Sequence, residues 1–69
     1  MKYTINSSAH VLVNLYDDKG QQVSTIVDQA LSPGEYSASL KAETLPSGIY
    51  ICVLLIDGKI MARIKVVVP

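Results

Sequence analysis

Residues 46–68, with the sequence PSGIYICVLLIDGKIMARIKVVV, contain two apolar runs separated by Asp57-Gly58. Both central residues of a two-residue type I′ turn need a positive φ, and Asp-Gly is among the pairs that adopt it most readily. The stretch therefore predicts a hairpin in which Ile49 to Ile56 pairs with Lys59 to Val68. Pro46-Ser47-Gly48 predicts a tight turn before it, because proline fixes φ and glycine adopts positive φ without a steric penalty.

Turn signals recur along the rest of the chain at intervals of about ten residues, which is the spacing of an all-β sandwich. They lie at Asn6-Ser7-Ser8, Asp17-Asp18-Lys19-Gly20, Ser32-Pro33-Gly34, Pro46-Ser47-Gly48 and Asp57-Gly58. The strands expected between them are Lys2 to Ile5, Ala9 to Tyr16, Gln21 to Val27, Glu35 to Lys41, Ile49 to Ile56 and Lys59 to Val68. We predict a single all-β domain over residues 2–68, an immunoglobulin-like antiparallel β-sandwich of six or seven strands.

Alternation of apolar and polar residues defines the expected core. Tyr36, Ala38 and Leu40 alternate with polar neighbours. In the last strand one face carries apolar residues and the other carries the basic row of Lys59, Arg63 and Lys65. Each of these strands should thus have one buried face and one solvent-exposed face. The predicted core consists of Val11, Val13, Leu15, Tyr36, Leu40, Tyr50, Leu54, Ile60, Ile64 and Val66.

The strand Ile49 to Ile56 differs from the others because both of its faces are apolar. A sandwich buries one face of a strand, so the other set of alternate residues needs a different cover. The stripe in question is Ile51, Val53 and Leu55. Uncovered apolar surface of this kind marks association sites. We expect the stripe to form a symmetric homodimer or to dock against an attached cargo domain, with Met61 as a neighbour.

Composition and charge exclude several classes of function. The chain has 69 residues, six Lys plus Arg, six Asp plus Glu, and one cysteine. Zero net charge gives no electrostatic footprint for nucleic acid. A single cysteine, Cys52, excludes an internal disulfide and a cysteine-based metal cluster within one chain. Met1 to Asn6 lacks the apolar segment of a secretory signal, and the longest apolar run is too short to span a bilayer. Export would therefore depend on a longer precursor.

No constellation of residues supports catalysis or metal binding. Nucleophilic catalysis needs a base within reach of the nucleophile, whereas His10 lies near the start of one strand and Cys52 in the middle of an apolar one. The segment Asp17-Asp18-Lys19-Gly20 lacks the further ligands of a calcium loop and is expected to form a turn with Asx hydrogen bonding. We therefore predict no catalytic residue, no cofactor site and no metal site.

Several short pieces of the chain together resemble a known family. Val11 to Asp17 forms a strand pattern that ends in an aromatic residue and Asp, and a glycine turn leads to a second strand pattern, Gln21 to Val27. Gly34 precedes an alternating strand, and Leu45-Pro46-Ser47-Gly48-Ile49-Tyr50 precedes the final hairpin. In this order of parts the chain is similar, from about Tyr3 to Val68, to the C-terminal sorting domain of proteins exported by the type IX secretion system.

Two positions depart from the pattern of that family. Leu40 stands where many relatives carry Trp, which changes the core volume and leaves the position apolar. The chain ends on Val66-Val67-Val68-Pro69, whereas many relatives end on a basic residue. It resembles the related hook-capping immunoglobulin-like modules almost as well.

The resemblance implies a secretion signal that is not an enzyme. Relatives are recognised by an outer-membrane translocon, and a sortase-like peptidase usually removes the domain and attaches the cargo to surface glycolipid. The implied route leads from the periplasm to the cell surface or the extracellular space. The implied recognition candidates are Pro46, Gly48, Tyr50, Gly58, Arg63, Lys65, Val66 and Val67. The alternative is a non-catalytic immunoglobulin-like structural or adhesion module of a secreted multidomain protein.

Overall fold

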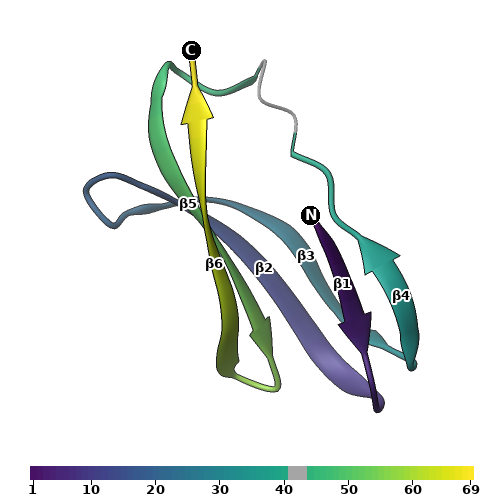
Figure 1. Ribbon diagram of the computed structural model, residues 1–69. Coiled ribbons are helices and arrows are strands. Elements are labelled where there is room, and N and C mark those ends of the chain that lie inside the picture. The colour runs from purple at the N-terminus through teal and green to yellow at the C-terminus, as the bar shows by residue number, and fades with distance from the viewer. Residues whose placement is uncertain (41–43) are drawn as a thin grey trace.

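The computed structural model describes residues 1–40 and 44–69, which form two antiparallel sheets (Figure 1). The strands are β1 (Lys2–Ile5), β2 (Ala9–Asp17), β3 (Gln22–Leu31), β4 (Gly34–Ser37), β5 (Gly48–Ile56) and β6 (Lys59–Val68). The larger sheet has the order β3-β2-β5-β6, and the smaller sheet pairs β1 with β4. The prediction of an all-β, antiparallel two-sheet fold is confirmed.

The predicted strand boundaries agree closely for four strands and differ for two. β1 and β6 have the predicted bounds, β2 ends one residue later at Asp17, and β5 begins one residue earlier at Gly48. β3 continues to Leu31 because its last residues pair with the beginning of β2. β4 ends at Ser37. The predicted end of that strand, Lys41, lies outside the described residues.

The turn of the final hairpin has the predicted geometry. Asp57 has φ of 50° and Gly58 has φ of 82°, as a type I′ turn requires. Two hydrogen bonds tie this turn to β2. The His10 backbone N–H donates to Asp57 Oδ1 over 2.9 Å, and the Asp57 backbone N–H donates to the His10 carbonyl oxygen over 2.9 Å. The hairpin is therefore fixed to the rest of the sheet at its tip.

The core lies between the two sheets and is centred on β2 and β5. Val11, Val13 and Leu15 of β2 are fully buried. The other buried members of the cluster are Ile5, Tyr50, Cys52, Leu54 and Val68. Tyr36, Leu40 and Val66 are partly buried and pack against it. The alternate residues of β5 that face the core are thus Tyr50, Cys52 and Leu54, and the opposite stripe faces outward.

Ile60 and Ile64 were wrongly predicted as core residues, since they are 51% and 42% exposed. In the ladder Leu54 pairs with Ala62 and the next residue of β5 pairs with Ile60, which leaves Met61 as an unpaired bulge. The bulge moves Ile60 to the outward face of the sheet. Ile64 keeps its place opposite a core residue, but β6 is an edge strand on the side away from the small sheet (Figure 1).

Candidate recognition surface

A hydrogen bond from Tyr50 holds the turn that precedes β5. Its hydroxyl donates to the carbonyl oxygen of Pro46, four residues earlier, over 2.6 Å, and its side chain is buried. A tyrosine that bonds back to the backbone in this way is the tyrosine corner of β-sandwich domains. A Cβ added at Gly48 would lie 3.8 Å from the Tyr50 ring. Proline, glycine and tyrosine therefore form one packed turn.

The same arrangement occurs before β4. The hydroxyl of Tyr36 donates to the carbonyl oxygen of Ser32 over 2.5 Å, again four residues earlier. A Cβ added at Gly34 would lie 3.7 Å from the Tyr36 ring. The sequence analysis predicted neither tyrosine hydrogen bond, although glycine precedes tyrosine by two residues at both turns.

The turn before β5 and the end of the chain lie together. Ser47 Oγ donates to the carbonyl oxygen of Pro69 over 2.8 Å, and Gly48 pairs with Val68. Ile49 pairs with Val67, which is 63% exposed. Recognition candidates that are about twenty residues apart in sequence thus form one end of the molecule. Gly58 lies at the opposite end of the hairpin, in the Asp57-Gly58 turn.

The basic row of β6 has two members rather than three. Arg63 pairs with Val53 and Lys65 pairs with Ile51. Both basic side chains therefore share the outward face of the sheet with the apolar stripe of β5. Lys59 pairs with Ile56, which packs against the core. The bulge described above therefore places Lys59 on the other face, contrary to the sequence prediction.

A shallow groove of about 680 Å³ runs along the outward face of β5, and we call it the outer groove. It is lined by Tyr16, Asp17, Asp18, Gly20, Ile49, Ile51, Val53, Arg63 and Lys65. The expected outward stripe is thus present, but its neighbours cover much of it. Val53 is only 8% exposed, whereas Ile51 and Leu55 are half-buried.

Polar side chains occupy the outward face of β2 and β3 next to the outer groove. Asn14 is buried, and its Oδ1 accepts hydrogen bonds from Gln22 Nε2 over 3.3 Å and from Thr25 Oγ1 over 3.0 Å. Its Nδ2 donates to the Tyr16 hydroxyl over 3.4 Å. The side chains of this network satisfy one another's hydrogen bonds, and most of the exposed apolar side chains lie instead on β5 and β6.

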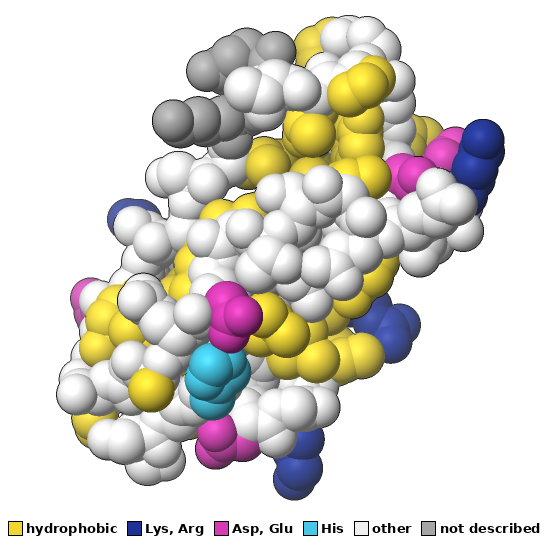
Figure 2. Space-filling view, turned by 180° about the vertical axis from the view of Figure 1, so that it is seen from behind, with side chains coloured by type: hydrophobic (Ala, Val, Ile, Leu, Met, Phe, Trp, Pro, Cys, Tyr) yellow, Lys and Arg dark blue, Asp and Glu magenta, His cyan; other side chains and the backbone are white. Residues whose placement is uncertain are grey.

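The histidine and the cysteine do not form a catalytic pair. Cys52 is buried opposite Leu15 of β2, and burial raises the pKa of its thiol. His10 lies five residues before Leu15, about 17 Å away along an extended strand. Its Nε2 lies 2.6 Å from Asp28 Oδ1, and both side chains are exposed. Figure 2 shows the histidine between two acidic side chains.

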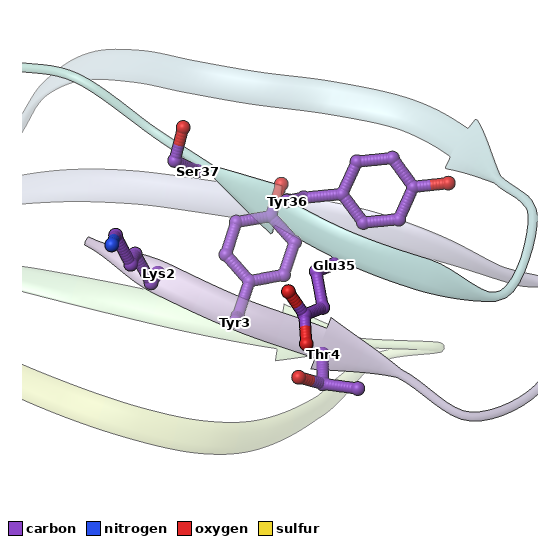
Figure 3. Close-up of a pocket in the computed structure, with 6 residues that line it drawn as sticks. All are labelled: Lys2, Tyr3, Thr4, Glu35, Tyr36 and Ser37. Carbon is purple, nitrogen blue, oxygen red and sulfur yellow. The ribbon is translucent and has the colours of Figure 1, made fainter.

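The small sheet carries a second open hollow, shown in Figure 3. It is lined by Lys2, Tyr3, Thr4, Glu35, Tyr36 and Ser37. The rings of Tyr3 and Tyr36 stack at 5.9 Å between centroids, and burial, together with Tyr36, raises the pKa of Tyr3. Within residues 1–40 and 44–69, every buried polar side-chain atom has a partner and no cluster of side chains could hold a metal ion. The described part of the hollow thus shows no unsatisfied group aimed at a ligand.

The family model described as "Secretion system C-terminal sorting domain" matches residues 2–69. The chain therefore belongs to this family, the C-terminal sorting domains of the type IX secretion system. Comparison with curated proteins and with solved structures finds no match. Among the described residues, no helix has the length and hydropathy needed to cross a membrane.

Family membership identifies the function that the sequence resemblance implied. The domain is a C-terminal sorting signal for type IX secretion. Such a signal interacts with the secretion machinery, is attached to a cargo protein, and directs export to the cell surface or the extracellular space. The family consists of sorting signals and is not a catalytic family. The adhesion-module alternative receives no support.

Proposed function

We propose that the secretion machinery reads the folded final hairpin of this domain, at the end where the Pro46 to Tyr50 turn meets the C-terminal strand. The observation that carries the proposal is the hydrogen bond from Ser47 Oγ to the Pro69 carbonyl oxygen. It joins the two sequence elements that resemble the family signature into one surface.

Within that surface some recognition candidates shape the turn and others are accessible. Tyr50 is buried and its hydroxyl is already bonded, so its role is to hold the turn in shape. Arg63, Lys65 and Val67 are exposed and offer positive charge and apolar area. Positive charge and apolar area suit a partner that has acidic and apolar groups. Because the surface is already folded, little binding free energy is spent on ordering it.

The proposal extends to the path of the protein. The sandwich over residues 2–68 acts as the C-terminal piece of a longer precursor, passes through the periplasm and meets an outer-membrane translocon. A sortase-like peptidase then removes it from the cargo. The domain itself performs no catalysis. The separation of His10 from buried Cys52 supports this last point, because the single histidine of the sequence does not reach the thiol.

A fusion experiment tests the recognition surface. The chain is attached to the C-terminus of a periplasmic reporter in a host with type IX secretion, and the reporter is measured on the surface and in the medium. We expect export with the intact chain and a loss of most export with Lys65→Glu. Lys59→Glu is the matched control, because it makes the same charge change on the opposite face of the same strand.

Circular dichroism of the isolated variants checks that both remain folded. Equal export of the two variants would refute the basic outward face as the surface that is read. A reporter that stays in the periplasm with the intact chain would refute the proposed reading of the final hairpin altogether.

A further inference from the structure

The outer groove has opposite charges on its two sides. Its acidic side is the turn between β2 and β3, with Asp18, together with Asp17 at the end of β2, whose Oδ1 also accepts two backbone N–H groups of the turn. Its basic side is β6, with Arg63 and Lys65. β5 runs between them and supplies the apolar floor. Because neighbouring strands are about 4.8 Å apart, the two charged sides are separated by about 10 Å. The groove is therefore polarised across the strands and not along them.

Exposed apolar side chains are concentrated on the final hairpin; Ile49 lines the groove, whereas Ile64 lies opposite the core residue Cys52 on the other face. Of the six large apolar side chains that are exposed among the described residues, five lie on β5 or β6. Two of these, Ile49 at 45% and Val67 at 63%, form a cross-strand pair on the outward face. Apolar area gathered in this way on one hairpin, next to a charged rim, has the composition of an association site.

We propose that the outer groove is the interface of a symmetric homodimer whose two-fold axis runs parallel to β5. When two copies meet through the same face, the two-fold axis lies in the plane of contact. Rotation about an axis along the strands exchanges the two sides of the groove, so the acidic turn of one copy meets the basic strand of the other. Rotation about an axis across the strands would place acid against acid.

Charge complementarity thus selects a second copy of this chain, in one orientation, as the occupant. The polar network around Asn14 limits the contact on the β3 side, because those groups already bond one another. The whole surface of the chain is 4679 Å². A standard interface takes about 800 Å² from each partner, or about a sixth of that surface. The groove involves only parts of two strands and the end of a third with its turn, so the dimer is weak and depends on concentration. It does not rest on the proposed recognition by the secretion machinery.

Charge reversal in separate and mixed samples tests the orientation. One variant carries Arg63→Glu and Lys65→Glu, and the other carries Asp17→Asn and Asp18→Lys. Asparagine is used at position 17 because Asp17 Oδ1 accepts the backbone N–H groups of Lys19 and Gln21, and the amide oxygen keeps that acceptor. Sedimentation equilibrium at low salt gives the dissociation constant of each sample, and Lys59→Glu is the control.

The expected result has three parts. Each reversed variant alone dimerises about tenfold or more weakly than the unaltered chain, because like charges then face each other. An equimolar mixture of the two recovers dimer to within about threefold of the unaltered chain. Lys59→Glu has no effect. A strict monomer at millimolar concentration, or a mixture no stronger than its components, would overturn the proposal and leave the groove to a different partner.

Discussion

Replacing Tyr50 by Phe should show how much the turn before the final hairpin depends on one hydroxyl. The substitution keeps the buried ring and its contact with Gly48, and it removes only the 2.6 Å hydrogen bond to the Pro46 carbonyl oxygen. Tyr36→Phe is the matched control, because it removes the same type of bond, to Ser32, from the corner before β4.

The expected magnitude follows from the burial of the two bonds. The Tyr50 bond is partly buried, so its loss leaves a carbonyl oxygen with little access to water and should cost about 1 to 3 kcal/mol of unfolding free energy. The Tyr36 bond is exposed, water can replace the hydroxyl, and its loss should cost about 0.5 to 1 kcal/mol. In a domain of this size, each kcal/mol lowers Tm by about 4–8 °C.

Thermal unfolding followed by circular dichroism measures both variants against the unaltered chain. Tyr50→Phe should have the lower Tm of the two. Export of a reporter fused to Tyr50→Phe should also fall, because the turn and the C-terminal strand share one hydrogen-bonded surface. If Tyr36→Phe lowers Tm as much as Tyr50→Phe or more, the argument from burial is incorrect.

Three further substitutions test the core, the hairpin turn and the buried thiol. Leu54→Ala should cost about 2 to 5 kcal/mol in urea denaturation, whereas Ile60→Ala, at a position 51% exposed, should change stability by about 0.5 kcal/mol or less. Gly58→Ala should cost about 1 to 2 kcal/mol through backbone strain alone, since φ is 82° and no atom lies within 4 Å of the added Cβ; Gly58→Asn should cost less. Burial raises the pKa of Cys52 above its ordinary 9.0, so its contribution to stability is complete below pH 9 and is lost as pH rises through the raised value. Cys52→Ala should therefore lose less stability than the unaltered chain between pH 8 and 11, measured by denaturation at each pH.

Local turn chemistry and alternation made most of the fold predictable from the sequence. Asp57-Gly58 specified the hairpin because few other pairs adopt positive φ at both positions. Val11, Val13 and Leu15 were correctly placed in the core because β2 is a central strand, which the small sheet covers on one face. In such a strand the residues on the covered face are buried; Asn14, on the other face, is buried by its own side-chain network.

Alternation failed where the ladder is irregular or the strand lies at an edge. The bulge at Met61 reverses the faces of Ile60 and Lys59, and residues 59–63 contain no glycine that would mark a bulge. Ile64 points to the correct side, yet it is half exposed because no strand flanks β6 on its outer edge in the described sheet. Whether a strand lies at the centre or the edge of a sheet depends on the topology of the whole fold. The alternation of residues within one strand does not encode this.

The sequence suggested residues for the candidate surface, but it did not predict how they lie relative to one another. Pro46, Gly48 and Tyr50 were chosen from a resemblance, and their hydrogen bonding gives the physical reason for that combination. The bond between Ser47 and Pro69 joins residues 22 positions apart and has no local signal in the sequence.

The unequal sizes of the two sheets bear on how the domain responds to mechanical load. A pull from a cargo that precedes the domain reaches β1 first, a strand of four residues paired with β4 and continued by the bond from the Ala38 N–H to the Met1 carbonyl oxygen. β6, in contrast, forms nine residue pairs with β5, and Pro69, the residue after it, accepts a hydrogen bond from Ser47. Tension should therefore detach β1 while the final hairpin stays folded, so that a cargo under strain would still carry an intact signal.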